Sequence, residues 1–343
     1  MTRLIVVEPG ARAKAALLID GRLEYLRIDP APDDETPRLE EVHRVRIRRI
    51  IAKQGAAHVK LGSGAKGFLR EAKGLSEGDI VTAQVSGFAE PGKATPLTMR
   101  RLHRGRYAIL TPDAPGVNVA RSLKDPEERA RLTAIGEERI TKGGPGLILR
   151  SAAAGAAPET ILDDIDDLIA LEIAASENGP PALLTDGPGA EVTAWREWGD
   201  PDELIREDDA FDRLGVWDQI DALRSVRADL GAGAWMAVEA TSALIAIDVN
   251  TGSDTAPDAA MKANRAAWTD LPRQLRLRGL GGQITVDFAP MRKNDRKAAE
   301  SGLKRAFASD SVQTTFAGWT PLGHFEMLRK RERRPLVEVL PDA

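Results

Sequence analysis

Two apolar runs that each end in an aspartate constrain the fold of this chain most. Residues 244–247 (LIAI) lead to Asp248, and residues 284–286 (ITV) lead to Asp287. Short apolar runs bounded by glycine and polar residues are typical of buried strands. Two buried strands that each deliver a carboxylate at the C-terminal end predict a site for a hard cation. Mg²⁺ suits such a site, because it takes oxygen ligands and keeps several of its waters.

A basic helix is predicted between the two runs, over residues 259–278. A cation, a basic helix and strand-end carboxylates together predict chemistry on a phosphate. The alternative is that the two aspartates only cap their strands.

Charge is segregated along the chain, although its net charge is only −4. Residues 38–110 carry 15 Lys and Arg against 6 Asp and Glu, residues 156–230 carry 5 against 20, and residues 262–334 carry 16 against 7. Basic segments attract polyanions, above all nucleic acids. An ordinary solvated surface is the alternative.

Length and composition exclude several classes of protein. The 343 residues suffice for two or three domains. The chain has no cysteine, which excludes disulfides and thiolate metal sites. Its apolar runs are too short to cross a membrane, so we expect a cytoplasmic protein with no membrane partner.

A small barrel is predicted in the first third of the chain. Residues 42–51 alternate basic and apolar side chains with period two, and four further short strands follow. Five short strands with basic faces are typical of an OB barrel, which binds single strands through a basic groove and stacking side chains. Phe68 is the best stacking candidate and His58 a weaker one, with barrel core as the alternative for Phe68. Lys93 either reaches a phosphate or is solvated.

Residues 144–151 (GPGLILRS) combine a turn, a strand and an Arg-Ser pair. The guanidinium of Arg150 and the hydroxyl of Ser151 could cradle a phosphate, with an ordinary surface pair as the alternative.

The acidic stretch is expected to be structural. Residues 158–176 predict an amphipathic helix with aspartates on its solvated face. Trp195, Trp198 and Trp217 are expected to be packing residues, because acidic surroundings disfavour stacking on nucleic acid. Further along, the sequence predicts a helix over 295–308, a strand over 312–316 and a basic terminal helix over 322–331.

At this point the residues resemble those of a known family. Residues 244–251, 273–282 and 286–288 resemble the catalytic signature of the ribonuclease E/G family, and residues 325–329 resemble the family's terminal helix. The resemblance extends in order along the chain: residues 1–30 are similar to an RNase H-like subdomain, 38–104 to its inserted S1-type OB domain, and 146–151 to a region that senses a 5′-monophosphate.

The resemblance implies roles for particular residues. Asp248 and Asp287 match two Mg²⁺-binding aspartates, and Asn250 matches an asparagine that orients them, in a fold similar to DNase I. Arg150 and Ser151 match the 5′-phosphate sensor, where the family usually has Thr in place of Ser151.

Other matches concern RNA contacts. Phe68 and Lys93 match RNA-contacting positions of the OB domain. His58 stands where the family usually has an aromatic side chain, and Gln313 where a basic residue is common near the site.

These matches predict an α+β multidomain protein. Its expected parts are a reduced RNase H-like subdomain (1–36 with 156–210), an S1-type OB RNA-binding domain (37–104), a 5′-sensor region (105–155) and a DNase I-like catalytic domain (211–343). Because the chain has no cysteine, we do not expect the family's zinc-linked homodimer. We also expect no long C-terminal scaffold, and a monomer or another oligomer instead.

We therefore expect an Mg²⁺-dependent endoribonuclease that cleaves single-stranded RNA, in rRNA or mRNA processing or decay, and leaves a 5′-phosphate and a 3′-hydroxyl. Arg276, Arg278 and Lys93 would track the RNA backbone. The alternative is an RNA-binding protein of the same fold with weak or no activity, which His58 and Gln313 favour. A DNA nuclease would rest on fold analogy alone.

Overall fold

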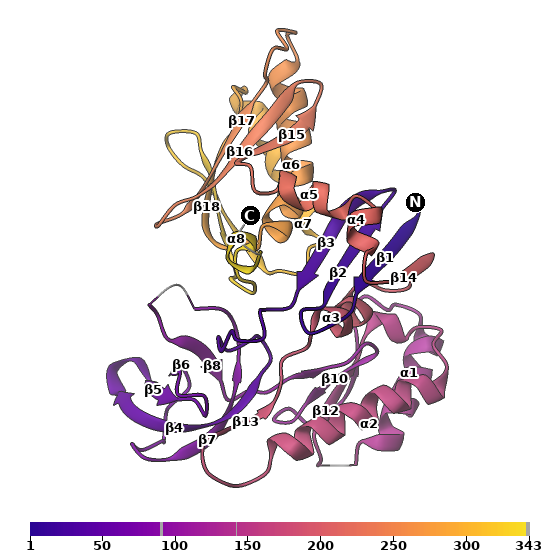
Figure 1. Cartoon of the computed structure of the whole chain (residues 1–343), viewed down its shortest axis with the longest axis vertical. Helices are drawn as coiled ribbons and strands as arrows, with labels where there is room; N and C mark the ends of the chain where they lie inside the picture. The colour runs from indigo at the N-terminus through magenta and orange to yellow at the C-terminus, as the bar shows by residue number, and fades with distance from the viewer. Residues whose placement is uncertain (90–91, 142, 341–343) are drawn as a thin grey trace. The chain divides into compact units, whose positions relative to one another are not determined.

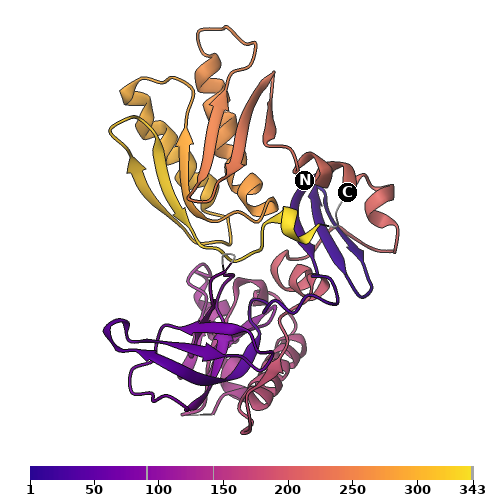
Figure 2. The ribbon, with the colours of Figure 1, turned by 60° about the vertical axis from the view of Figure 1, so that its left-hand side comes forward.

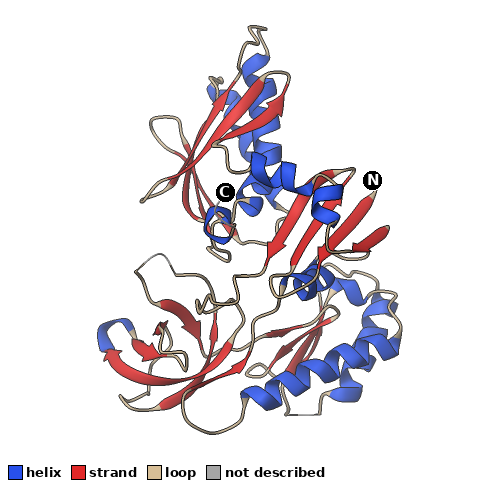
Figure 3. Cartoon of the chain, viewed as in Figure 1, coloured by secondary structure: helices blue, strands red, loops and turns tan. Residues whose placement is uncertain are grey.

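The computed structural model describes residues 1–89, 92–141 and 143–340. The chain forms two compact units, Met1–Ala31 with Pro201–Ala343 and Pro32–Asp200. Both units combine sheets with helices (Figures 1 and 3).

A six-stranded sheet of the first unit carries the two aspartate strands. Its order is β15-β16-β17-β18-β20-β19, and β17 pairs with β18 in parallel (Figure 2). The two apolar runs form these central strands, as predicted: β17 is Ile245–Asn250 and β18 is Gly282–Asp287. The flanking strands are β15 (Arg227–Gly231), β16 (Ala234–Ala240), β20 (Phe325–Arg329) and β19 (Thr314–Trp319).

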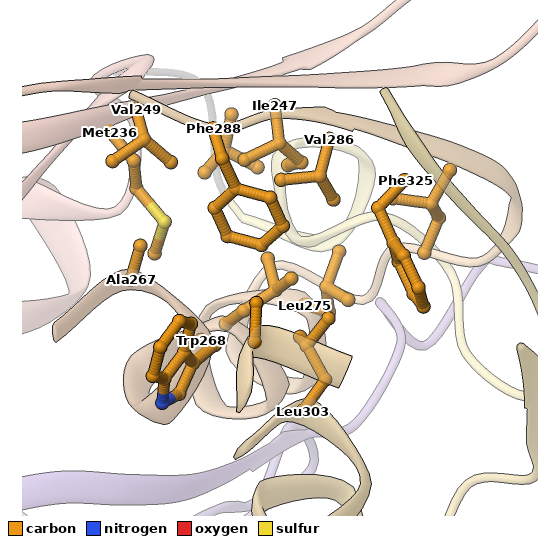
Figure 4. Packing of buried hydrophobic residues seen from close by; sticks show 14 of the residues in the cluster. Met236, Ile247, Val249, Ala267, Trp268, Leu275, Val286, Phe288, Leu303 and Phe325 are labelled. Carbon is orange, nitrogen blue, oxygen red and sulfur yellow. The ribbon is translucent and has the colours of Figure 1, made fainter. Parts of the chain in front are cut away.

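Two helices cover one face of this sheet. Figure 4 shows Ile247 and Val286 of the strands packed with Trp268 and Leu303 of the helices. These helices are α6 (Ala259–Leu277) and α7 (Arg296–Phe307), close to the predicted ranges. Successive side chains of a strand point to opposite faces, so the residues between the buried ones lie on the face away from the helices.

The predicted terminal helix over residues 322–331 is wrong. The segment contains β20, which pairs with both β18 and β19. Phe325, Met327 and Arg329 are buried, whereas Leu328 is 59% exposed. Buried and more exposed side chains alternate here, as they do in a strand. The basic residues of the segment make this pattern hard to see in the sequence.

A second sheet of the first unit has its own core. Its strand order is β14-β1-β2-β3, with β14 parallel to β1. Short helices pack against it around Phe211 and Leu23. The elements are β1 (Arg3–Glu8), β2 (Lys14–Ile19), β3 (Arg22–Ile28), β14 (Glu203–Arg206), α4 (Ala210–Arg213), α5 (Val216–Ala222) and α8 (Leu336–Val339).

The second unit contains a five-stranded barrel of the OB-like kind that the sequence predicts. Its strands run in the order β4-β5-β6-β8-β7, and a further pairing of β4 with β7 closes it. Gly67 allows tight closure, because a Cβ atom there would lie 2.6–2.7 Å from side-chain atoms of Leu97, Leu61 and Val59. The strands are β4 (Val42–Ile51), β5 (Ala56–Lys60), β6 (Lys66–Leu69), β7 (Ile80–Val85) and β8 (Thr95–Thr98), and β13 (Ala182–Thr185) extends the sheet beside β4.

The remainder of the second unit is a four-stranded sheet with helices. Its order is β11-β12-β10-β9. Ile161 and Ile165 of the amphipathic helix pack in one cluster with Leu110 and Leu147 of this sheet. That helix therefore packs with residues 103–149, which differs from the expected grouping of 156–210 with 1–36. The elements are β9 (His103–Arg104), β10 (Ala108–Thr111), β11 (Gly116–Val119), α1 (Pro126–Arg139), β12 (Gly146–Leu149), α2 (Pro158–Ala175) and α3 (Ala190–Glu197).

A buried ion network ties α6 to β20 in the first unit. Asp310 accepts hydrogen bonds from Arg329 Nη2 at 2.9 Å and from Arg276 Nη1 at 2.8 Å. The side chains of Asp310 and Arg329 are each 1% exposed. Removing one partner of a buried ion pair leaves the other charge without compensation in a poorly solvated place.

We expect Asp310→Asn to lower the free energy of unfolding by about 3–5 kcal/mol, measured by urea denaturation. Asp258→Asn is the matched control, because Asp258 pairs with Lys262 on the exposed surface of α6 and its loss should hardly change stability. Equal effects of the two substitutions would show that Asp310 does not compensate buried charge.

Candidate active site

Asp248 and Asp287 occupy opposing positions on neighbouring parallel strands. The register of β17 and β18 pairs them directly, one step after the buried pair Ile247 and Val286. Both aspartates are exposed on the face away from α6 and α7. Neighbouring strands lie about 4.8 Å apart, so the two carboxylates can share one cation.

Asn250 lies on the same face as Asp248, two residues further along β17. Its Nδ2 donates a hydrogen bond to Asp248 Oδ2 at 2.8 Å. This bond is consistent with the orienting role that the resemblance implies for Asn250. It also leaves the amide oxygen of Asn250 available as a third oxygen next to the pair.

His324 is a residue of this face that the sequence reasoning missed. Its Nε2 lies 3.7 Å from Asp287 Oδ2, beyond hydrogen-bond distance. The placement follows from the pairing of β18 with β20, in which Phe325 opposes Val286 and His324 is the next residue outward. The predicted helix over residues 322–331 gives no reason for His324 to lie near Asp287. Only the strand register of β20 with β18 places the two residues side by side.

The donor set fits Mg²⁺. Two carboxylates and one amide oxygen are hard ligands, and Mg²⁺ keeps several waters rather than filling its shell from the protein. Among the residues that the structure describes, no three or more His, Asp or Glu side chains are grouped closely enough to hold a metal by themselves. A Mg²⁺ ion at these oxygens would keep waters on its remaining positions.

The expectation that Arg276 and Arg278 track an RNA backbone requires correction. Arg276 is 7% exposed and bonds to Asp310 and to Glu24, while its guanidinium stacks on the ring of Tyr25 at 4.0 Å. Arg278 is 8% exposed and donates to the carbonyls of Leu223 and Ser225. Both guanidinium groups are used inside the first unit.

The titration of Arg278 reflects this burial. Loss of solvent lowers the pKa of its guanidinium to about 10, and the nearby charge of Arg273 acts in the same direction. The lowered pKa means that burial disfavours the charged form of Arg278, and the carbonyls of Leu223 and Ser225 offset part of this cost.

Phe68 and His58 lie together on the outer surface of the barrel. They oppose each other across β5 and β6, and their rings meet edge to face with centroids 5.6 Å apart. Phe68 is half-buried and does not belong to the cluster of side chains that fills the barrel. Lys93 is exposed in the turn before β8. This placement favours a surface position for Phe68 over the barrel core.

Arg150 and Ser151 lie at the end of β12, where a short 3₁₀ helix (Ser151–Ala153) begins. Arg150 donates to the carbonyl of Gly105 at 2.6 Å and to Glu197 Oε2 at 2.8 Å, and Ser151 is exposed. Burial acts to raise the pKa of Glu197, but the charges of Arg150 and Arg196 outweigh it and hold that pKa below its ordinary value.

The chain combines an OB-like barrel with an aspartate pair on parallel strands. This combination is consistent with the catalytic region of the ribonuclease E/G family. The sequence model of the ribonuclease E/G family matches residues 103–201 and 200–332. The chain belongs to the ribonuclease E/G family. Among the residues that the structure describes, no helix combines the length and apolar composition needed to span a bilayer.

Individual relatives agree with this assignment. Ribonuclease E of Nostoc sp. is 31% identical over 283 residues, which are 69% of this chain and 41% of that protein. Ribonuclease G of Haemophilus influenzae is 27% identical over 364 residues, 88% of this chain and 74% of that protein. Ribonuclease G of Escherichia coli K12 is 26% identical, over 87% of this chain and 74% of its own length. The chain thus spans less than half of the Nostoc relative.

The predicted family is confirmed, and the mixed α+β architecture with its five-stranded barrel is consistent with it. The individual roles of Asp248, Asn250, Asp287, Phe68 and Lys93 stay predictions, as do those of Arg150 and Ser151.

The role of Asn250 can be tested by the stabilisation that Mg²⁺ gives to the folded protein, because a ligand that binds only the native state raises the melting temperature. In Asn250→Ala the carboxylate of Asp248 loses its orienting donor. We expect the Mg²⁺ concentration for half-maximal stabilisation to rise about 10–100-fold. Asn294→Ala, an exposed change elsewhere in the same unit, should leave it unchanged.

Proposed function

We propose that this protein is an Mg²⁺-dependent endoribonuclease that cleaves single-stranded RNA. The observation that carries the proposal is the direct pairing of Asp248 with Asp287 in the parallel register of β17 and β18, in a chain that belongs to the ribonuclease E/G family. Its biological role would be the processing or decay of rRNA or mRNA.

The chain's own residues would prepare the reaction as follows. Asp248 and Asp287 would hold the ion, and the hydrogen bond from Asn250 would orient Asp248. When bound, Mg²⁺ lowers the pKa of a coordinated water and offsets charge that develops on the phosphate. The imidazole of His324, beside Asp287, is placed to contact a phosphate oxygen or a bound water. Hydrolysis would join the water oxygen to phosphorus and break the bond from phosphorus to O3′, while a proton of the water passes to O3′, which leaves a 5′-phosphate and a 3′-hydroxyl.

The barrel would hold the RNA strand. Arg49 on β4 opposes His58, and Pro96 on β8 opposes Phe68. With the pairing of His58 and Phe68, cationic and flat side chains form one row across the outer surface of the barrel. Unpaired bases would stack on Phe68, while Lys93 contacts a phosphate. Arg150 and Ser151 would receive a 5′-monophosphate. We further propose the division into RNase H-like, OB, sensor and catalytic parts, with α2 assigned to the sensor part.

Cleavage of a single-stranded RNA in Mg²⁺ tests the catalytic assignment. We expect Asp248→Asn and Asp287→Asn each to lower kcat by roughly a hundredfold or more, because each removes a charge that holds the ion. Glu300→Gln is the control, since Glu300 pairs with Lys304 on the exposed surface of α7. Cleavage by both aspartate variants at the wild-type rate would reject the assignment. RNA binding without any cleavage by the wild type would favour the alternative of an inactive RNA-binding protein.

The barrel surface can be tested separately by fluorescence anisotropy with labelled single-stranded RNA. Phe68→Ala should weaken binding by about tenfold, since one stacked base is lost. Leu183→Ala, which truncates an exposed side chain of β13 in the same unit, should bind as the wild type does. If the two variants bind RNA equally well, Phe68 does not contact it.

A further inference from the structure

Trp195 differs from the other two tryptophans of the acidic stretch. Trp198 is 4% exposed, and Trp217 packs edge to face on Phe211 with centroids 5.8 Å apart. Both are therefore packing residues, as expected. Trp195 instead lies on helix α3 with 52% of its surface exposed, so the packing expectation does not account for it.

One face of the Trp195 ring is fixed by a buried cation. The guanidinium carbon of Arg106 lies 4.0 Å from the ring centroid, which is the distance of a favourable cation–π contact. Arg106 itself is 3% exposed, pairs with Asp200 at 2.6 Å and donates to the main-chain carbonyl of Trp195. The indole is thereby held in place before any ligand arrives, and binding would cost it little conformational entropy.

Trp195 and Arg150 both contact the segment of residues 105–107. Arg106 belongs to this segment, and its neighbour Gly105 accepts the hydrogen bond from the Arg150 side chain. The backbone N–H of Arg150 donates to the carbonyl of Tyr107 at 2.7 Å. Arg150 also reaches Glu197 on α3, the helix that carries Trp195. The ring and the candidate phosphate site are therefore parts of one hydrogen-bonded assembly.

The charges around the ring are compensated. Asp200 is paired with Arg106, and Glu197 is paired with both Arg150 and Arg196. A base that stacks on the ring would consequently gain little from long-range Coulomb attraction. What the ring offers is a flat, polarisable and immobile surface, which suits the π-face of a nucleobase of any identity.

We propose that Trp195 is a stacking platform for an unpaired base at the 5′ end of the RNA, adjoining a phosphate held at Arg150 and Ser151. This inference rests on the proposed function, because it names how the substrate of that function is held. The base gains a preformed aromatic partner, and the cation behind the indole keeps that partner from rotating away.

The test measures binding of a short single-stranded RNA with a 5′-monophosphate by fluorescence anisotropy, with the label at the 3′ end. Trp195→Ala should raise Kd about tenfold, and Trp195→Phe should restore most of the affinity because it keeps an aromatic face. The loss should be similar at about 50 and 200 mM salt, since stacking releases no counterions. Val192→Ala is the matched control, an exposed apolar truncation on the same helix.

A second RNA that lacks the 5′-terminal base but keeps its sugar and phosphate identifies the partner of the ring. Wild type should bind this abasic RNA about tenfold more weakly than the intact RNA, whereas Trp195→Ala should bind the two alike. A merely structural role for Trp195 would weaken both RNAs equally in the variant, and that result would overturn the inference.

The inference and the proposed function can fail separately. If Trp195→Ala binds the intact RNA as tightly as wild type while wild type still cleaves RNA in Mg²⁺, the platform is refuted and the nuclease stands. If wild type neither binds nor cleaves single-stranded RNA, both are refuted. An unchanged far-ultraviolet circular dichroism spectrum of Trp195→Ala shows that the comparison concerns folded protein.

Discussion

Repulsion between two carboxylates on neighbouring strands is the constraint on which this site depends. Like charges that oppose each other across a strand pair destabilise a sheet, and the parallel register of β17 and β18 places Asp248 and Asp287 in that position. The surrounding structure holds the arrangement, since Ile247 and Val286 are anchored in the core beneath α6 and α7. A divalent cation between the two carboxylates would offset this repulsion, which supports the proposed metal site.

The parts of the fold that sequence reasoning predicted are those with strong local signals. The runs before Asp248 and Asp287 are apolar and end in polar residues, which locates β17 and β18 and places both carboxylates at one end of the sheet. The alternation over residues 42–51 likewise locates the first strand of the barrel. In each case a period of two or a bounded apolar run is visible without knowledge of any distant partner.

The parts that could not be predicted depend on partners far away in the sequence. Arg276 is basic and on a helix, but its burial follows from Asp310 and Glu24, which only the tertiary structure brings to it. His324 reaches Asp287 through the pairing of β18 with β20. The Trp195 ring is held by Arg106, which lies 89 residues earlier in the chain. Composition and spacing contain no information about such pairings.

The location of a bound ion is the most direct test of the central claim, that the aspartate pair of the parallel strands is a metal site. Crystals of the protein soaked in Mn²⁺, which replaces Mg²⁺ on oxygen ligands and scatters anomalously, should show one strong anomalous peak within coordination distance of both Asp248 and Asp287. Ordered carboxylates without such a peak, or a peak held by other residues alone, would contradict the account.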